Sequence, residues 1–262
     1  MKLIENGVVG YALIKFAQVC GLNVADDISP IALNEVLQKK WRKATEGTQR
    51  AQLEGPFPTK EELQLLGPLG AGAILISWGT KYKGTLLLGA TLKAVARRVA
   101  FMLDQEDEDW QDGDWIPSPV YLLGSSRKLN DKQEMPEHIP AILEETGAKF
   151  ADQWQRDAAV PNCWPRTELE MMERVLEWMG TAYHWKVVPV LAPDGVKQDG
   201  SPRPANTAET VKEWLMQVQP GHYLIVSSQP FCEGQKMAVE RAVKEAGKEG
   251  YTFDVCGPEA PP

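Results

Sequence analysis

The stretch "HYLIVSSQPFCEGQKMAVERAVKEAGKEGYTFDVC" (residues 222–256) decides the fold class of this protein. Its beginning, 222–228, and its end, 251–256, are short apolar runs that are typical of buried β-strands. Between them, residues 233–247 carry apolar side chains at helical spacing. A helix between two such strands predicts a βαβ unit, in which the strands are parallel and the sheet is covered on both faces.

The same alternation of strand and helix continues toward the N-terminus, as far as residue 73. We expect further strands at 73–78, 119–126 and 185–193, and further helices at 86–103, 166–180 and within 203–215. This pattern predicts an α/β protein, namely a Rossmann-like three-layer sandwich with a mostly parallel sheet of about five strands.

The chain divides into two predicted regions. Residues 1–68 predict an all-helical N-terminal region, in which Ser29 and Pro30 form a good N-cap and first-turn pair. Residues 69–262 predict the Rossmann-like domain. Within that domain we expect a loop at 104–118 and a loop or lid insertion at 127–165, which is rich in Pro and Trp and holds either a helix or a lid.

Composition excludes several classes of protein. The 262 residues carry a formal net charge of −8, and such a surface repels the phosphate backbone of nucleic acids. The four cysteines are widely spaced, which argues against a zinc ribbon and favours a reducing compartment. The apolar stretch 7–22 is interrupted by Lys15 and Gln18 and is too short to span a membrane. We therefore expect a cytoplasmic protein without a membrane anchor.

Candidate ligand-binding residues follow the predicted strands, because open parallel sheets bind ligands beyond the carboxyl ends of their strands. Small residues at these positions let backbone N–H groups approach a ligand closely. The candidates are Gly79, Thr80, Gly124, Ser125, Ser126, Arg127, Ser227, Ser228 and Gln229. Taken singly, each of these stretches is also typical of an ordinary strand-to-helix turn. A shared pocket is favoured only because all of them are expected at one edge of the sheet.

Two helix starts supply further polar candidates. Thr167 and Glu168 open helix 166–180, whereas Asn206, Thr207 and Glu209 open the helix within 203–215. An Asn or Thr at the N-cap stabilises a helix by about 1 kcal/mol, and a Glu in the first turn complements the helix dipole. These residues therefore predict helix caps, and contact with a ligand is the second interpretation.

Several catalytic signatures are missing from the sequence. There is no G-x-x-x-x-G-K-[ST] loop, no G-x-G-x-x-G after a strand and no G-x-S-x-G elbow. The histidines, His138, His184 and His222, are scattered, which argues against a histidine-based triad or a multi-histidine metal site. The acidic run 104–114 lacks the spacing of a calcium loop and is interpreted as a solvated loop, so no metal is predicted.

An ordered set of these residues resembles the YdcF/SanA/ElyC-like family, known as domain of unknown function 218, over about residues 70–256. The set consists of Thr167-Glu168 with Met172, Asn206-Thr207-Ala208-Glu209 before a helix, Ser227-Ser228 after a strand, and "QPFCEGQKMA" (229–238). The resemblance implies a Rossmann-like fold whose pocket is lined by Glu168, Asn206, Thr207 and Glu209. One branch of that family is associated with S-adenosylmethionine, and others are membrane-anchored and tied to cell-envelope physiology.

The chain departs from the family pattern after the last motif strand. The family usually has a His or basic residue followed by Arg there, whereas this chain has Phe231 and then Gly234 and Gln235. Without that Arg, the site lacks the family's natural clamp for a phosphate or carboxylate group. Arg127 and Lys236 are the candidates to replace it.

Three functions stay open at this point. The first is binding of a nucleoside-type cofactor such as S-adenosylmethionine, with Glu168 or Glu209 as hydrogen-bond acceptor and, in an enzyme, as general base. The second is a hydrolase or transferase acting on a phosphate-bearing envelope precursor. The third is an interaction protein that uses its N-terminal helices and the Trp-bearing segments 106–117 and 153–165. The other interpretation of those Trp residues is packing onto the domain.

Overall fold

The fold is that of a computed structural model of the whole chain. The structure describes residues 4–5, 8–9, 13–14, 17–18, 21–41, 74, 80–107, 117–160, 163–181, 185–197, 199–229 and 231–259. The chain separates into two compact units, one made of Met1–Ala73 with Glu259–Pro262 and the other of Ile74–Pro258. Each unit is described by itself.

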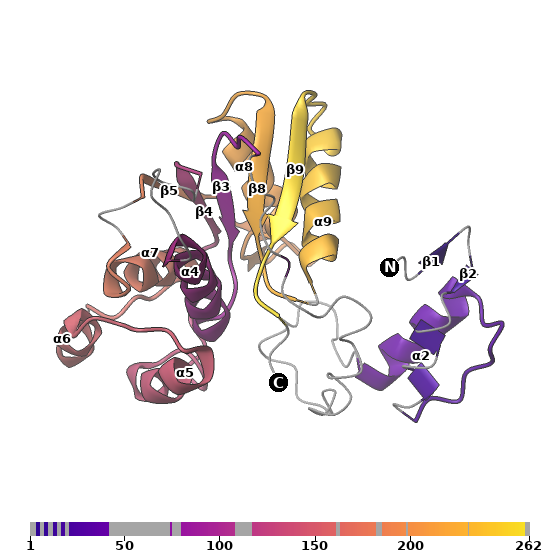
Figure 1. Cartoon of the computed structure of the whole chain (residues 1–262), viewed down its shortest axis with the longest axis horizontal. Coiled ribbons are helices and arrows are strands. Elements are labelled where there is room, and N and C mark those ends of the chain that lie inside the picture. Colours follow the sequence, from indigo (N-terminus) through magenta and orange to yellow (C-terminus); the bar gives the residue numbers. More distant parts are fainter. Residues whose placement is uncertain are drawn as a thin grey trace. The chain divides into compact units, whose positions relative to one another are not determined.

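The larger unit is built on a five-stranded sheet in the order β5-β4-β3-β8-β9, in which all four neighbouring pairs are parallel (Figure 1). The strands are β3 (Thr85–Leu88), β4 (Val120–Gly124), β5 (Val187–Leu191), β8 (Gly221–Val226) and β9 (Tyr251–Cys256). Counted along the chain, this is the order 3-2-1-4-5 of the Rossmann fold. The predicted α/β class and mostly parallel sheet are confirmed.

Helices cover both faces of this sheet. Figure 1 shows α9 (Cys232–Glu245) on one side and α4 (Leu92–Asp107) and α7 (Glu168–Trp178) on the other. Successive strand residues point to opposite faces, so Leu87 packs with the α4 and α7 side, whereas Leu86 packs with α8 (Thr207–Leu215) and α9. Two separate hydrophobic cores thus enclose the sheet, as a three-layer sandwich requires.

The first strand of the sheet lies elsewhere than predicted. It is β3, formed by residues that were assigned to the start of helix 86–103, and α4 begins only at Leu92. The reason is that Thr85–Leu88 is a short, wholly buried apolar run, and Gly89 interrupts the helical pattern after it. Of the predicted strand 73–78, only Ile74 lies within the described residues, and it forms an isolated antiparallel bridge with Gly257.

The insertion after β4 is helical and packed. It contains η3 (Pro136–His138), α5 (Ile139–Thr146) and α6 (Gln153–Ala159). Trp164 stacks on the buried Trp178 of α7 at a ring-centroid distance of 5.1 Å, and Trp154 packs against the same core. The packing interpretation of the Trp residues is therefore confirmed for Trp154 and Trp164, while Trp110 and Trp115 lie outside the described residues.

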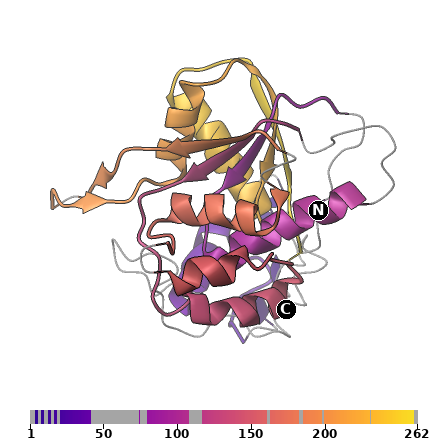
Figure 2. The same cartoon turned by 90° about the vertical axis from the view of Figure 1, so that its left-hand side faces the viewer.

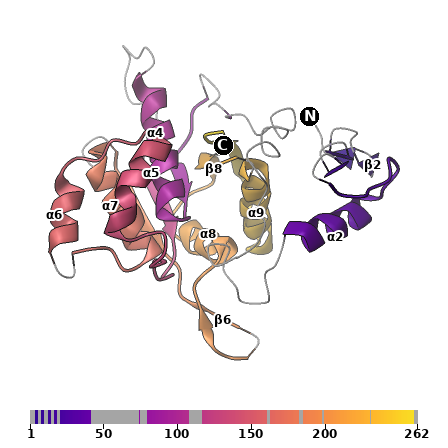
Figure 3. The ribbon, with the colours of Figure 1, turned by 90° about the horizontal axis from the view of Figure 1, so that it is seen from below.

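A small hairpin follows β5, which the sequence did not predict. Its strands β6 (Gly195–Val196) and β7 (Pro202–Arg203) pair antiparallel, and the hairpin projects away from the sheet (Figures 2 and 3). The predicted loop 104–118 also begins later than expected, since α4 continues to Asp107.

The smaller unit contains both strand and helix in its described part. The helix α2 (Pro30–Trp41) begins as predicted at Pro30, and the Ala32 N–H donates to Ser29 Oγ at 3.2 Å. The expectation of an all-helical region is wrong for β1 (Ile4–Glu5) and β2 (Val8–Val9), which pair antiparallel. The intervening Asn6-Gly7 is a hairpin-turn dipeptide, and it is the sequence signal for these strands that was missed.

Residues 42–68 of the predicted helical region lie outside the described residues. No helix in the part of the chain that the structure describes is long and apolar enough to cross a membrane.

Candidate functional site

The strand order places a topological switch point between β3 and β8, because the chain leaves β3 toward β4 and returns to β8 on its other side. The predicted residues Gly124–Arg127 and Ser227–Gln229 lie at or directly after the carboxyl ends of β4 and β8, as expected.

Thr80 does not lie at this edge, because it precedes β3 and hydrogen-bonds Tyr82. The ring of Tyr82 stacks on His222, near the amino end of β8. Gly79 lies outside the described residues. The residues that follow β3 are instead Gly89, Ala90 and Thr91.

Glu168 lies at the centre of this edge. Thr167 caps α7 by accepting a hydrogen bond from the Glu170 N–H at 3.3 Å, and Glu168 is the first residue of the helix. Glu168 Oε2 accepts from the Ser125 N–H at 3.0 Å and from Ser125 Oγ at 2.6 Å. Its carboxylate lies against Gly89, where an added Cβ would be 2.8 Å from Glu168 Cδ. Glycine at 89 thus allows the carboxylate of one helix to touch the end of the neighbouring strand.

Arg127 connects Glu168 to a second carboxylate, Glu134. Arg127 Nη1 and Nη2 donate to Glu134 Oε2 and Oε1 at 2.7 and 3.0 Å, and Arg127 Nε lies 3.4 Å from Glu168 Oε1. The Glu134 side chain is fully buried, and Oε1 also accepts from the Leu92 N–H at 2.9 Å. Because Leu92 is the first residue of α4, Glu134 supplies a carboxylate to the N-terminus of that helix from another part of the chain.

Arg98 joins the ends of the two switch-point strands. Its Nη1 donates to the Leu88 carbonyl at 2.6 Å, and its Nε donates to Ser228 Oγ at 3.0 Å. Arg98 is 5% exposed, and this burial lowers its pKa to about 10, while the charge of Glu168 acts in the opposite direction. The guanidinium remains a cation at neutral pH and crosslinks β3 to the turn after β8.

The turn after β8 contains a polar group without a partner. Ser227 is fully buried, and its Oγ has no hydrogen-bond partner among the residues that the structure describes. The neighbouring Ser228 and Gln229 are also buried, and the Gln229 N–H donates to the Pro258 carbonyl at 3.0 Å. A buried hydroxyl without a partner is unusual in a folded protein, which keeps Ser227 among the candidate ligand-binding residues.

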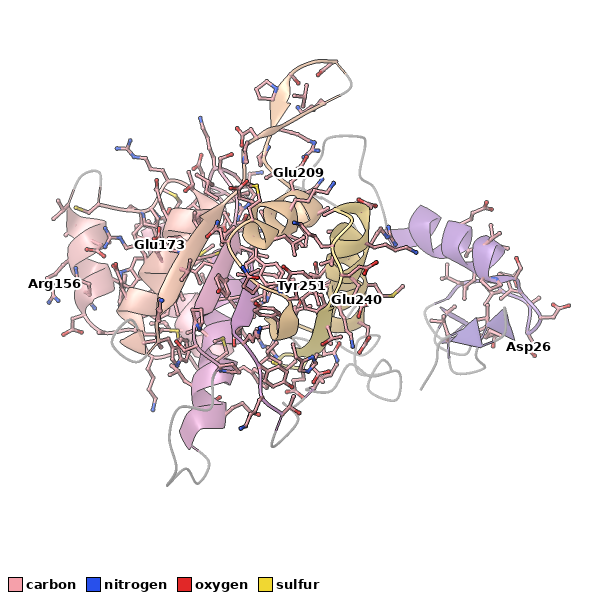
Figure 4. All side chains as sticks on the ribbon, turned by 90° about the horizontal axis from the view of Figure 1, so that it is seen from above. Asp26, Arg156, Glu173, Glu209, Glu240 and Tyr251 are labelled. Carbon is pink, nitrogen blue, oxygen red and sulfur yellow. The ribbon has the colours of Figure 1, made fainter. Side chains whose placement is uncertain are left out.

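Asn206 and Glu209 form a capping box at the start of α8. Asn206 Oδ1 accepts from the Glu209 N–H at 3.1 Å, and Glu209 Oε2 accepts from the Asn206 N–H at 2.8 Å, with Thr207 as the first helical residue. Glu209 also forms a bidentate ion pair with Arg203 of β7, at the end of α8 that faces the hairpin (Figure 4). The hydrogen bond from Arg203 lowers the pKa of Glu209. Both Glu209 oxygens are therefore engaged within the protein, and the cap interpretation is confirmed.

A second contact ties the carboxyl end of β4 to the segment after β5. Ser126 Oγ donates to Asp194 Oδ1, and both side chains are accessible to solvent. Ser125, Ser126 and Arg127 are therefore each held by a carboxylate of another segment.

Comparison of this chain with known proteins finds no family model, curated protein or solved structure that matches it. The resemblance to the YdcF-like family thus rests on the residues quoted above and remains a prediction.

The structure brings Ser125, Arg127, Glu168 and Ser228 into one hydrogen-bonded region and adds Gly89, Arg98 and Glu134, which the sequence analysis missed. Arg98 lies in a helix at ordinary spacing, and Glu134 lies in a segment interpreted as a loop, so neither has a local signal. Among the described residues, no group of three or more His, Cys, Asp and Glu side chains is arranged to hold a metal ion.

The two predicted replacements for the family Arg are placed differently. Arg127 is committed to Glu134 and Glu168, and the charge of Lys236 acts on Asp254 of β9. It is Arg98 that brings a guanidinium to the turn after β8. Gly234 and Gln235 lie in the first turn of α9, and Phe231 is the N-cap residue of that helix.

Proposed function

We propose that the carboxyl ends of β3, β4 and β8 bind a small nucleoside-type ligand, with S-adenosylmethionine as the first candidate. The observation that carries the proposal is the position of Glu168. Glu168 is the first residue of α7, but its carboxylate lies at the carboxyl end of the second strand in chain order, β4, where it accepts hydrogen bonds from Ser125. In dinucleotide folds a carboxylate near this edge of the sheet accepts hydrogen bonds from ribose hydroxyls.

Glu168 keeps hydrogen-bonding capacity for such a ligand. A carboxylate has about four acceptor sites, and those of Oε2 are used by the two donors of Ser125. Among the residues that the structure describes, Oε1 has only the long contact with Arg127 Nε at 3.4 Å. A ribose hydroxyl or an amino group is therefore a suitable donor for Oε1. Because residue 89 is a glycine, the Glu168 carboxylate can lie close to the end of β3.

The same arrangement limits the role of Glu209. Glu209 accepts three short hydrogen bonds, two from Arg203 and one from the Asn206 N–H, whereas Oε1 of Glu168 has only a long contact among the described residues. Glu168 is therefore the stronger candidate both for ligand binding and for a general base. Asn206 and Thr207 lie at the α8 N-terminus, and their contact with a ligand remains a prediction.

Isothermal titration calorimetry of the full chain with adenosine, S-adenosylmethionine and S-adenosylhomocysteine tests the proposal. We expect Glu168→Gln to weaken binding at least about tenfold, since a hydrogen bond to a charged group contributes about 1.5–3 kcal/mol. Glu177→Gln is the matched control, because Glu177 lies exposed on the same helix and pairs with Arg174. Absence of binding heat for all three ligands at two temperatures, or equal affinity of Glu168→Gln and wild type, would refute the proposal.

A further inference from the structure

The N-terminus of α4 holds a protein carboxylate at the place where Rossmann folds bind phosphate. In those folds, the pyrophosphate of the cofactor lies at the N-terminus of the helix after the first strand, where free N–H groups and the helix dipole attract an anion. Here the corresponding helix is α4, and its first N–H group, that of Leu92, donates to Glu134 at 2.9 Å.

The N–H group of Gly89, in the turn from β3 to α4, is also used within the protein. The Gly89 N–H donates to the Leu123 carbonyl of β4 at 2.9 Å, so it is not available to a ligand. Glycine amides in this turn are the groups that allow the backbone to approach a pyrophosphate in dinucleotide folds. Two of the donors that a phosphate would use are thus already satisfied by this chain.

The nearby cations are committed as well. Arg127 is 11% exposed and forms two hydrogen bonds with Glu134, whose remaining capacity is used by the Asn130 N–H at 2.8 Å. Arg98 is buried and donates to the Leu88 carbonyl and to Ser228. These two guanidinium groups therefore accompany two carboxylates, those of Glu134 and Glu168, and neither guanidinium is left to bind a phosphate dianion.

We propose that Glu134 is a specificity-determining residue, which restricts the site to nucleosides whose 5′ substituent is neutral or cationic and excludes 5′-phosphorylated ones. This inference rests on the proposed nucleoside binding and adds which class of nucleoside the site accepts. A phosphate monoester carries a charge of about −1.5 to −2 at pH 7 and would meet the Glu134 carboxylate at the α4 N-terminus.

Paired titrations of the full chain with adenosine and with AMP test this inference. We expect wild type to bind adenosine at least about tenfold more tightly than AMP, because the phosphate would meet the Glu134 carboxylate where the N–H donors of Leu92 and Gly89 are already used. Glu134→Gln keeps an oxygen for Leu92 and Arg127 but removes the negative charge, so we expect the preference for adenosine to fall at least about threefold. Glu137→Gln is the control, since Glu137 is exposed on η3 and its loss changes the net charge equally.

The outcomes separate this inference from the proposed function. If AMP binds wild type as tightly as adenosine, the selectivity inference is wrong while nucleoside binding stands. If neither compound nor S-adenosylmethionine binds, the proposed function fails and the inference fails with it. An equal change of preference in Glu134→Gln and Glu137→Gln also overturns the role of Glu134. If Glu134→Gln does not fold by circular dichroism, the wild-type ratio of the two affinities still decides.

Discussion

Glu209 illustrates how one carboxylate stabilises a helix start and couples it to pH. Its pKa is lowered by the hydrogen bond from Arg203, and the carboxylate also completes the capping box with Asn206. A lowered pKa in the folded state means that the stabilisation is fully present above the unfolded value of about 4.3 and is lost as pH falls through the lower folded value.

Glu209→Gln should therefore lower the free energy of unfolding by about 0.5–1 kcal/mol at pH 7, a modest amount because the pair is partly exposed. The difference from wild type should shrink between pH 7 and pH 3, because pH 3 lies below the unfolded value of about 4.3 and the wild-type carboxyl loses its charge as pH falls through the lowered folded value. Urea unfolding at both pH values measures it, with the exposed Glu240→Gln of α9 as control. A difference that persists unchanged at pH 3 would show that the ion pair is not its source.

At this scale the sequence predicts local contacts and misses distant ones. The cap of α8 could be predicted, because Asn206 and Glu209 are three positions apart and their spacing alone determines the interaction. The contact of Glu134 with Leu92 could not, since 42 positions separate them and only the packing of the insertion against α4 joins them. The same holds for Arg98 and Ser228, which are 130 positions apart.

The turn from β3 to α4 is the element on which the site depends. Gly89→Ala places a Cβ 2.8 Å from Glu168 Cδ, a distance that Cβ atoms essentially never adopt, so the carboxylate must move away from Ser125. We expect nucleoside affinity to fall at least about tenfold and stability to fall by about 1–3 kcal/mol.

The control for this substitution is Gly234→Ala in α9, where an added Cβ meets no atom within 4 Å. That variant should keep its affinity and gain about 0.5 kcal/mol in stability, because alanine is the better helix former. Calorimetry and urea unfolding of both variants give the comparison. Unchanged affinity in Gly89→Ala would show that the ligand does not depend on the position of Glu168.

This turn also explains why the first strand was misplaced. Residues 86–103 are mostly apolar, with their charged residues confined to Lys93, Arg97 and Arg98, and a short buried strand followed by a helix can have the same composition as one long helix. The other four strands are separated from their helices by longer polar or Pro-containing segments, and each of them was predicted near its true position. Gly89 and Thr91 were the local signals of the boundary, but a single glycine is tolerated inside a helix and a threonine before an apolar residue is common.

At the scale of the whole molecule, the two units have separate hydrophobic cores. Both cores of the sheet are formed by residues between Ile74 and Cys256, whereas a third cluster, which includes Val9, Ile14 and Leu33, belongs to the smaller unit. A unit with its own core satisfies the main physical requirement for folding alone.

A fragment of residues 74–258 is therefore expected to unfold in one cooperative transition and to bind adenosine with the affinity of the full chain. Thermal unfolding followed by circular dichroism, and calorimetry with adenosine, test the two parts of this prediction. Starting the fragment at Ile74 keeps its bridge with Gly257, which a later start would remove. A fragment that folds but binds adenosine more weakly than the full chain would contradict this prediction. A fragment that folds and binds would confine ligand recognition to the sheet, because every residue assigned to the site, from Gly89 to Ser228, lies between Ile74 and Pro258.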